Sequence, residues 1–452
     1  MSGDLIDIGR LALAQGSGLP GEIEVYVQHA QTTSIKVYGG EVESLVTGEP
    51  RGAGVRYVHQ GRIGYAYTGD VGRDALASAV QQAVHNAAVA EPDVYASLPG
   101  APREYPEVGG LWRTGLLSTP VERKVGLALA AEACALAEPE VETVEESAYV
   151  DSATRIAIVS SAGVEVYEEQ TFCYVYVSAH ARRGDDVQTG MGFVTGRDPD
   201  DLDADAAGRE GARKAVRQLG GAPCPTGRYT VVLDREVAAS VFGFIAQALT
   251  AEAVQKGRSL FAGRVGQRVA ADRFSLWDDG LHPDGMATSP FDDEGVPHQK
   301  TALVGHGVLQ GYLHDTYTAA KEGGEIRSTG NASRGSYRGS PGVSPSNLVV
   351  APGNGDLADL LGRVGTGLYV VSITGLHSGA NAVSGEFSVG AVGLLIEGGA
   401  LAAPVREVTI ASDLLSLLQN VSDLGADTRW IPFGGSVLTP SVAIGDITVA
   451  GT

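Results

Sequence analysis

The stretch IAIVSSAGVEVYEEQTFCYVYVSA, residues 156–179, decides how the middle of the chain folds. Two runs of β-type residues, Ile156 to Ser160 and Val164 to Glu168, flank the short glycine-containing turn Ser161-Ala162-Gly163. This arrangement predicts a β-hairpin. The next run, Phe172 to Ala179, is rich in aromatic and β-branched residues, which predicts a further strand.

On the N-terminal side of the hairpin, helical and strand patterns occur in separate blocks. Apolar residues at helical spacing predict helices at 4–15, 72–90 and 120–137. Alternating patterns between glycine turns predict strands at 23–27, 35–37, 53–59 and 62–67. These strands indicate an antiparallel meander. The proline-rich stretch 92–120 predicts a linker and a domain boundary.

On the C-terminal side, a helix is predicted at 200–218, with aspartates at its start and basic residues towards its end. A strand at Tyr229 to Leu233 and a helix at 236–255 follow. The remaining chain predicts short strands and glycine turns that end in a strand at Val442 to Val449. Within that remainder, helices are expected only at 356–363 and 412–419.

These patterns predict an α+β protein of three parts. Residues 1–118 form an N-terminal α/β region with an antiparallel sheet, and residues 119–226 form a middle α/β region. Residues 227–452 form a large β-rich C-terminal domain. The 62 glycines in 452 residues fit such a turn-rich chain.

The charge balance and the cysteines limit the partners and the compartment. The chain has 33 Lys and Arg against 54 Asp and Glu, a net charge of -21, which disfavours nucleic acids and anionic membranes as partners. Cys134, Cys173 and Cys224 form no CxxC pair. The first residues are acidic, and no apolar run reaches the roughly 18 residues of a membrane span. We therefore expect a cytoplasmic protein.

Common catalytic and metal-binding motifs do not fit the sequence. Asp201, Asp203 and Asp205 have the start of a calcium-loop spacing, but alanines occupy the later positions that need glycine and glutamate. There is no Gly-Lys-Ser/Thr phosphate loop and no GxSxG elbow. The nine histidines include no pair one helical turn apart with a glutamate alongside. We therefore predict no metal bound by this chain.

The most specific segment is the acidic turn Phe291-Asp292-Asp293-Glu294-Gly295-Val296-Pro297. Residue types alone favour a solvated turn. The blocks downstream of it change this interpretation. They are Ser328 to Arg334, Ser344 to Val350, Gly375 to Asn381 and Ser384 to Ser388.

In this order, these blocks resemble the C-terminal domain of the TldD/PmbA metalloprotease family. The resemblance extends over nearly the whole chain, through the further blocks Gly52 to Arg56, Gly61 to Ala66, Pro404-Val405, Thr409 to Ala411 and Val449 to Gly451. Each block alone is weakly specific. Their common order along the chain identifies the family.

The family has two branches that pair with each other, and the TldD branch binds its catalytic metal through an HExxxH helix and a late cysteine. The equivalent helix here, 236–255, contains no histidine, and the closing segment Trp430 to Val437 contains no cysteine. The resemblance therefore implies the PmbA branch, with no catalytic residue of its own and with zinc in a TldD-like partner subunit. Peptidase activity is expected only from the complex, in leader-peptide processing or in degradation of unfolded chains.

Six residues are candidates for a substrate cleft or a partner interface. They are Asp292, Asp293, Glu294, Asn331, Arg334 and His377. The alternative for the last three is loop stabilisation through hydrogen bonds from side chain to backbone. Two other functions remain open: a stand-alone hydrolase that uses His377 with Glu386 or the acidic turn, and a non-catalytic homodimeric peptide-binding scaffold.

Overall fold

The computed structural model describes residues 2–433 and 435–452. Gly434, in the closing segment considered above, lies outside the described residues. The chain forms two compact units. Unit 1 comprises the chain up to Leu219 together with Ser289–Pro297 and Asp315–Gly342. Unit 2 comprises Gly220–Thr288, His298–His314 and Val343–Thr452.

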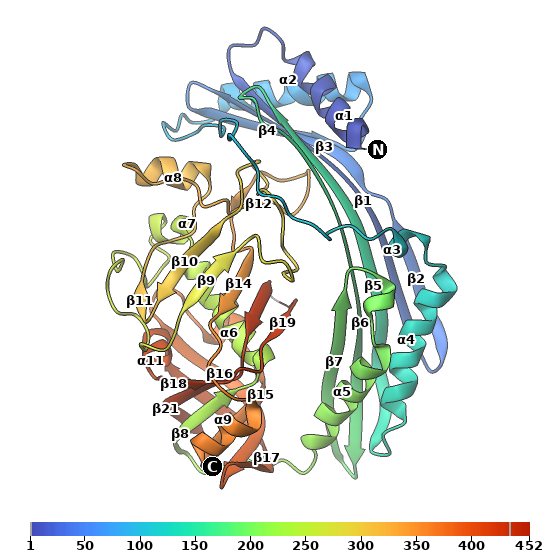
Figure 1. Cartoon of the computed structure of the whole chain (residues 1–452), viewed down its shortest axis with the longest axis vertical. Helices are drawn as coiled ribbons and strands as arrows, with labels where there is room; N and C mark the ends of the chain where they lie inside the picture. The colour runs from blue at the N-terminus through green and yellow to red at the C-terminus, as the bar shows by residue number, and fades with distance from the viewer. Residues whose placement is uncertain (1, 434) are drawn as a thin grey trace. The chain divides into compact units, whose positions relative to one another are not determined.

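Unit 1 contains one seven-stranded antiparallel sheet with the order β4-β3-β1-β5-β6-β7, and β2 pairs with β1. Its strands are β1 (Glu22–Tyr38), β2 (Glu41–Gly48), β3 (Arg51–His59), β4 (Arg62–Thr68), β5 (Val141–Ser160), β6 (Glu165–Arg183) and β7 (Asp186–Gly196). Long strands β1, β5 and β6 lie side by side (Figure 1). The predicted hairpin is confirmed as β5 and β6, whereas the two short strands predicted at 23–27 and 35–37 are one continuous strand.

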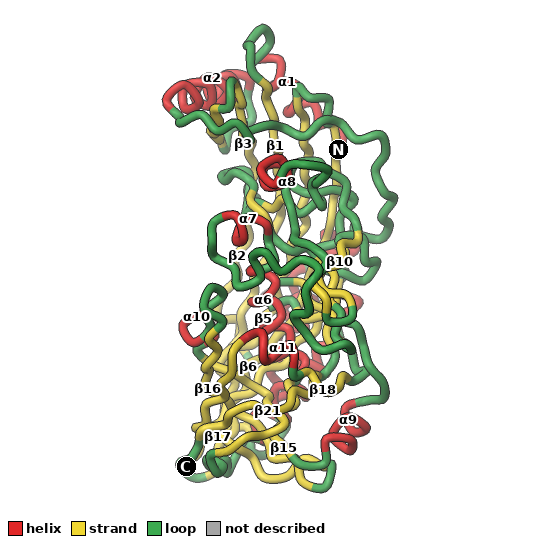
Figure 2. The backbone as a smooth tube through the Cα atoms, turned by 90° about the vertical axis from the view of Figure 1, so that its left-hand side faces the viewer, coloured by secondary structure: helices red, strands yellow, loops and turns green. Residues whose placement is uncertain are grey.

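One face of this sheet packs against the four helices α1 (Ser2–Gln15), α2 (Arg73–Val89), α4 (Val121–Leu136) and α5 (Ala204–Arg217). The other helical segments of unit 1 are α3 (Thr114–Ser118), η1 (Pro199–Asp201) and α8 (Thr316–Glu322). Side chains alternate between the faces of a strand, so Val25 and Val27 of β1 pack with α1 and α2, and Ile35 packs with α4 and α5. In the view of Figure 2, α1 and α2 lie together at the end of β1 and β3.

The opposite face of the sheet carries a second apolar cluster. Tyr26 of β1 and Val166 of β6 pack there with Phe291 and Tyr337, which come from much later in the sequence. This packing brings the segments Ser289–Pro297 and Asp315–Gly342 into unit 1, although both lie within the predicted C-terminal domain. The three-part division of the sequence stays a prediction.

Unit 2 is built from two six-stranded sheets, with the orders β11-β10-β9-β14-β20-β19 and β17-β16-β15-β8-β21-β18. A further pairing of β17 with β21 closes part of the second sheet into a ring. Helix α6 (Arg235–Ala248) contacts strands of both sheets. The other elements are β8 (Gly227–Leu233), β9 (Leu276–Asp279), β10 (Lys300–Gly305), β11 (Val308–Leu309), β14 (Asn347–Val350), β15 (Gly367–Thr374), β16 (Glu386–Glu397), β17 (Ala400–Asp413), β18 (Val421–Leu424), β19 (Arg429–Ile431), β20 (Ser436–Thr439), β21 (Val442–Ala450), α7 (Ala251–Gln255), α9 (Leu357–Val364), α10 (Leu376–Gly379) and α11 (Leu414–Gln419). Two short strands complete the chain, β12 (Ala332–Ser333) and β13 (Gly342–Val343).

The α+β class is confirmed, but one predicted helix was too long, and the expectation of helices only at 356–363 and 412–419 in the remainder of the chain was wrong. The helix predicted at 236–255 ends at Ala248 and is followed by the separate helix α7. The break occurs because Leu313 bonds to the backbone of Leu249 and Ala251, while Thr250 caps α7 by accepting from the N–H of Ala253. Helices α8 and α10 were not predicted, because seven and four residues are too few to show helical periodicity.

The aspartates at the start of the predicted helix 200–218 cap helices. Asp198 caps η1 and accepts from the N–H of Asp200, and Asp203 caps α5 and accepts from the N–H of Ala206. Of the three aspartates with calcium-like spacing, Asp203 thus caps α5, and Asp201 accepts from the N–H groups of Arg197 and Asp198. Over residues 2–433 and 435–452, no helix has both the length and the apolar character to cross a membrane.

Candidate functional site: a buried acidic turn and its ion pairs

The acidic turn is closed by its own first carboxylate. Oδ1 of Asp292 accepts from the N–H groups of Glu294 and Val296, at 2.9 Å each. Gly295 between them has a positive φ of 76°, and a Cβ there would lie 2.5 Å from Cγ1 of Val164. The turn therefore requires glycine at this position. Oδ2 of Asp292 accepts from the N–H of Ala332 at 2.9 Å and so joins the turn to β12.

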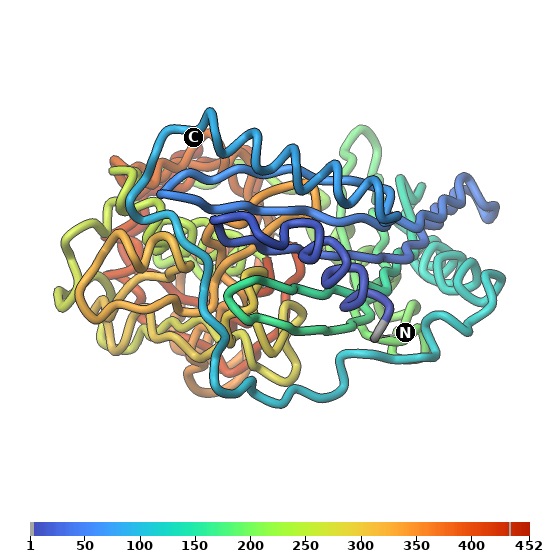
Figure 3. The backbone as a smooth tube through the Cα atoms, turned by 90° about the horizontal axis from the view of Figure 1, so that it is seen from above, coloured from blue at the N-terminus to red at the C-terminus, as the bar shows by residue number. Residues whose placement is uncertain are grey.

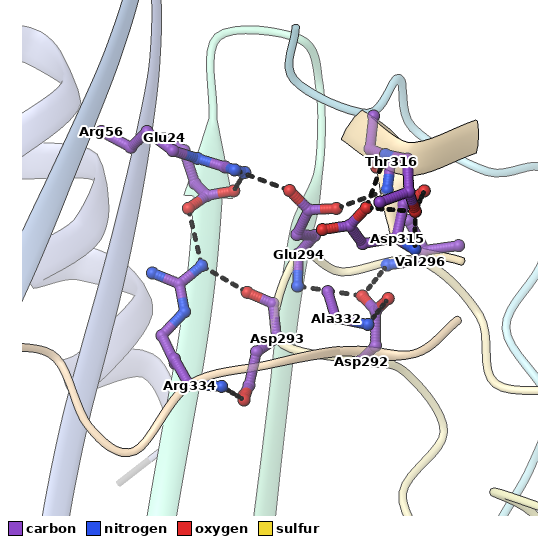
Figure 4. Close-up of polar contacts among 11 residues, drawn as sticks. Glu24, Arg56, Asp292, Asp293, Glu294, Val296, Asp315, Thr316, Ala332 and Arg334 are labelled. Carbon is purple, nitrogen blue, oxygen red and sulfur yellow. Dashed lines mark hydrogen bonds and ion pairs between the residues drawn. The ribbon is translucent and has the colours of Figure 1, made fainter. Parts of the chain in front are cut away.

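Glu294 belongs to a chain of buried ion pairs that begins in the sheet. Arg56 of β3 bonds through Nη2 to Oε2 of Glu24 at 2.5 Å and through Nη1 to Oε1 of Glu294 at 2.6 Å. The Arg56 side chain is 7% exposed, and the two glutamate side chains are 1% exposed each. Oε2 of Glu294 also accepts from the N–H of Thr316, at the start of α8, at 3.0 Å (Figure 4).

Arg334 extends this chain of ion pairs to the second aspartate of the turn. Its Nη2 lies 2.9 Å from Oε1 of Glu24 and also donates to the main-chain oxygen of Asp293. Its backbone N–H donates to Oδ2 of Asp293 at 2.7 Å. The guanidinium lies over the ring of Tyr26, 4.3 Å from its centre. We call Glu24, Arg56, Asp292, Asp293, Glu294 and Arg334 the ion-pair network.

The network sets the charge states of its three consecutive carboxyl groups. Burial, together with the charge of Glu294, raises the pKa of Asp292 well above its usual range, although three backbone N–H groups oppose the rise. Burial also raises the pKa of Asp293, against the pull of Arg334. For Glu294, burial acts in the same direction, but Arg56 and Thr316 outweigh it and leave its pKa lowered. Of these three carboxyl groups, Glu294 is therefore the one whose ionised form the network favours most.

The structure brings four of the six candidate residues together, with Asn331 beside them, whereas His377 belongs to the other unit. Asp292, Asp293, Glu294 and Arg334 are members of the network. Asn331 is buried beside it, next to Ala332, and its Oδ1 accepts from the hydroxyl of Thr329 at 2.6 Å. His377 is exposed in α10 of unit 2. The alternative of a solvated turn was wrong, because Asp292 and Glu294 are buried. A role of these residues at a substrate cleft or partner interface stays a prediction.

Two members of the network, Glu24 and Arg56, were missed by the sequence reasoning. They are direct neighbours across the antiparallel pair β1 and β3. Glu24 stands between Ile23 and Val25, and Arg56 follows Val55 in a block that was noted only for its family resemblance. Opposite charges in the middle of two apolar strands were the available signal, since such charges are buried only in pairs.

The network is suited to holding segments in place. Its carboxylates, which include Glu24 of β1, accept from guanidinium and backbone N–H donors of β3, the acidic turn, the segment 332–334 and the start of α8. It thereby fixes two late segments of the sequence to the N-terminal sheet. Within the part of the chain that the structure describes, no three or more His, Cys, Asp or Glu side chains are grouped so that they could hold a metal ion.

A half-buried glutamate next to the acidic turn gives a testable pH dependence. Burial raises the pKa of Glu168 in β6 to about 7, Asp293 adds to the rise, and a hydrogen bond from Ser289 opposes it. The folded chain therefore keeps this proton up to a higher pH than the unfolded chain, whose glutamates titrate near 4.5. We expect Glu168 to lower the free energy of unfolding as the pH rises from about 4.5 to about 7.

In the Glu168→Gln variant, this contribution should be absent. Urea unfolding at pH 5 and pH 7.5 should give a smaller loss of stability with rising pH for the variant than for the unchanged chain. Gln170→Ala on the same strand removes no titratable group and serves as the control. Equal pH dependence of the stability in the unchanged chain and the Glu168→Gln variant would contradict the raised pKa of Glu168.

Sequence comparisons place this chain in a class of metallopeptidases. The models of the PmbA/TldA metallopeptidase family match residues 23–87 (domain 1), 115–219 (central domain) and 226–451 (C-terminal domain). The chain belongs to the TldD/PmbA family of metallopeptidases.

Individual relatives cover almost the whole chain. The metalloprotease PmbA of Escherichia coli O157:H7 is 27% identical over 446 residues, which are 96% of this chain and 94% of the relative. A metalloprotease of Methanothermobacter thermautotrophicus is 28% identical over 92% of this chain and 90% of its own length. The crystal structure of TldE from Thermococcus kodakarensis matches with a TM-score of 0.89 at 25% identity, over 98% of this chain and 99% of that chain.

Proposed function

We propose that this chain is the non-metal-binding subunit of a cytoplasmic metalloprotease complex of the TldD/TldE type. A TldD-like partner carries the zinc and cuts extended or unfolded peptides, either to remove a leader segment or to degrade the chain. The similarity to proteins named PmbA and TldE supports this assignment. The observation that carries it is the composition and burial of helix α6.

Helix α6 stands where the resemblance places the HExxxH helix of the TldD branch. Its sequence, REVAASVFGFIAQA, contains no histidine. Nine of its fourteen residues are buried, and they are Val237, Ala238, Ala239, Val241, Phe242, Gly243, Ile245, Ala246 and Ala248. The five residues that are not buried, Arg235, Glu236, Ser240, Phe244 and Gln247, include neither an imidazole nor a thiolate for a metal.

The polar groups near the start of α6 are also occupied. Glu236 lies 3.8 Å from Nη1 of Arg429. Asp234 caps the helix by accepting from the N–H of Glu236 at 3.0 Å, and it also accepts from the hydroxyl of Tyr369. Zinc prefers imidazole and thiolate ligands in a tetrahedral arrangement. The donor set of this helix does not fit zinc.

The test is cleavage of an unfolded protein substrate by the purified chain, by a TldD-like HExxxH subunit from the same organism, and by their mixture. We expect cleavage only by the mixture, because water activation requires the partner's metal and the activity is proposed for the complex. A chelator should abolish cleavage by the mixture. The elemental analysis of this chain alone should find no stoichiometric zinc.

An inactive partner serves as the control. Replacing the glutamate of its HExxxH motif with glutamine removes the general base. The mixed complex should then still assemble but have no peptidase activity. Chelator-sensitive cleavage by this chain alone, or about one zinc ion per chain, would instead support a stand-alone hydrolase. Failure of the two subunits to co-purify or to enhance cleavage would contradict the complex.

A further inference from the structure

The N-terminal half of β6 has one edge without a partner strand. β5 pairs with β6 from Glu165 to Ala181, whereas β7 pairs with it only from Cys173 onward. Over the described chain, no strand occupies the second edge of β6 between Glu165 and Gln170. An edge of this kind presents main-chain donors and acceptors in register for another strand.

The direction of these main-chain groups follows from one hydrogen bond. The N–H of Thr171 points away from β5 and donates to the oxygen of Leu111 at 2.9 Å. In an antiparallel sheet, alternate residues direct both N–H and C=O to the same side. Glu165, Tyr167 and Glu169 therefore direct their main-chain groups to the unoccupied edge.

A connecting segment runs along this edge without closing onto it. We call residues 101–111 the strap. Its first residue, Ala101, donates to the oxygen of Ala162 at 3.4 Å, and its last, Leu111, accepts from Thr171. Figure 3 shows the chain from about residue 92 to 113 passing around the outside of the hairpin of β5 and β6. The strap is therefore held to the hairpin at both ends, and an open hollow lies between it and β6.

That space is a hollow of about 770 Å³. Its volume lies within the range of about 300 to 1,000 Å³ that is typical of ligand sites. It is lined by Tyr105, Pro106, Glu107, Val108, Gly109, Glu165, Val166, Tyr167, Pro290 and Phe291. Tyr105 is held edge-on against Phe291, with ring centres 5.8 Å apart, and its hydroxyl donates to the oxygen of Gly295 at 2.8 Å. One wall of the hollow is therefore preformed.

The lining indicates which side chain would fit. It combines the rings of Tyr105, Tyr167 and Phe291 with two charged residues, Glu107 and Glu165, both of which are acidic. Glu165 pairs with Arg10 at 2.5 Å, and Glu107 is exposed on the strap. Aromatic faces and carboxylates together attract a Lys or Arg side chain. The net charge of -21 also favours a cationic ligand.

We propose that the hollow and the free edge of β6 form a binding site for an extended peptide segment with a Lys or Arg side chain. The segment pairs with the main chain of Glu165, Tyr167 and Glu169, and its basic side chain enters the hollow towards Glu107. Strand addition gives affinity independent of sequence, and the hollow adds selectivity. The source of the segment is the substrate of the complex, so this step rests on the proposed function.

Binding to the full chain alone tests the site. The probes are fluorescein-labelled heptapeptides, capped at both ends, with alternating Val and Thr and a central Lys or Gln. Fluorescence anisotropy should give a Kd about fivefold lower for the Lys peptide, because a half-buried ring and an exposed carboxylate contribute modestly to cation binding. A Lys peptide N-methylated at alternate residues should bind at least about tenfold more weakly, since it loses several strand hydrogen bonds.

A variant on the strap isolates the role of the carboxylate. Glu107→Gln should weaken binding of the Lys peptide about threefold and leave the Gln peptide unchanged. Glu104→Gln, also exposed on the strap but outside the lining, is the matched control and should change neither Kd. Equal affinity for the Lys and Gln peptides, or for the N-methylated peptide, overturns the inference.

The two proposals fail in different experiments. In one case, the Lys peptide binds as described, but addition of an HExxxH partner gives no cleavage. This result would contradict the proposed function and the assignment of the segment as substrate, while the basic-peptide site itself would stand. Partner-dependent cleavage that is unaffected by Glu107→Gln, together with no binding of the Lys peptide to this chain, would overturn the site alone.

Discussion

Replacing Arg56 with alanine should lower the free energy of unfolding of unit 1 by about 3–5 kcal/mol. Arg56 is the only bridge between Glu24 and Glu294 that the ion-pair network contains, and both carboxylates are 1% exposed. Its removal leaves Glu294 with the N–H of Thr316 and without its cation. A buried charge that loses its partner keeps its full desolvation cost, whereas the lost attraction is no longer available to offset it.

The same strand supplies a matched control. Arg51 of β3 pairs with Asp4 at 2.8 Å, but the two side chains are 36% and 66% exposed. Exposed pairs contribute about 0–1 kcal/mol, so Arg51→Ala should change stability by no more than that. Chemical denaturation of the two variants beside the unchanged chain measures the difference. A similar small loss for both variants would show that the network does not hold the late segments to the sheet.

A double replacement separates the charge from the packing. Arg56→Met together with Glu294→Leu removes both the cation and the carboxylate it bridges and leaves apolar side chains of similar length. Buried ion pairs replaced by apolar groups are often close to neutral in stability. We expect the double variant to regain part of the loss of Arg56→Ala. Additive losses would instead point to the hydrogen bonds of the acidic turn as the main source of stability.

The local pattern of the sequence was enough for the regular elements. The hairpin 156–179 was predicted because its strands alternate and its turn contains Gly163, which has a positive φ of 94°. The helix at 236–255 was predicted too long, because the residue that interrupts it, Leu313, lies far along the sequence. Periodicity describes one segment at a time and carries no information about a distant main-chain partner.

The candidate site shows the same limit more strongly. Family blocks pointed to the acidic turn and to Arg334, but not to Glu24, which is 310 residues away from Arg334 in the sequence and 2.9 Å away in space. The residue types of the turn, with three consecutive carboxylates, are those of a solvated loop. Their burial depends on two strands of the N-terminal sheet that supply the cation and the apolar surroundings. Only the tertiary fold brings these parts together.

The burial of helix α6 leads to the second large expected effect. Ile245 is 1% exposed and lies among the other buried apolar residues of the helix, as the sequence predicted. Ile245→Ala removes buried methyl and methylene groups and leaves a cavity between the two sheets of unit 2. We expect the free energy of unfolding to fall by about 2–5 kcal/mol, and Ile245→Val to cost about 0.5–1.5 kcal/mol.

Gln247 on the same helix provides the matched control, because its side chain is exposed. Gln247→Ala should change stability by at most a few tenths of a kcal/mol, since both residues are good helix formers. Thermal unfolding of these variants, beside a zinc titration of the unchanged chain, tests both the packing and the role of the helix. Graded losses from Val to Ala at position 245, without zinc stabilisation, would fit a helix that serves only for packing. Equal stability of Ile245→Ala and Gln247→Ala, or a rise in Tm with zinc that α6 variants abolish, would contradict that role.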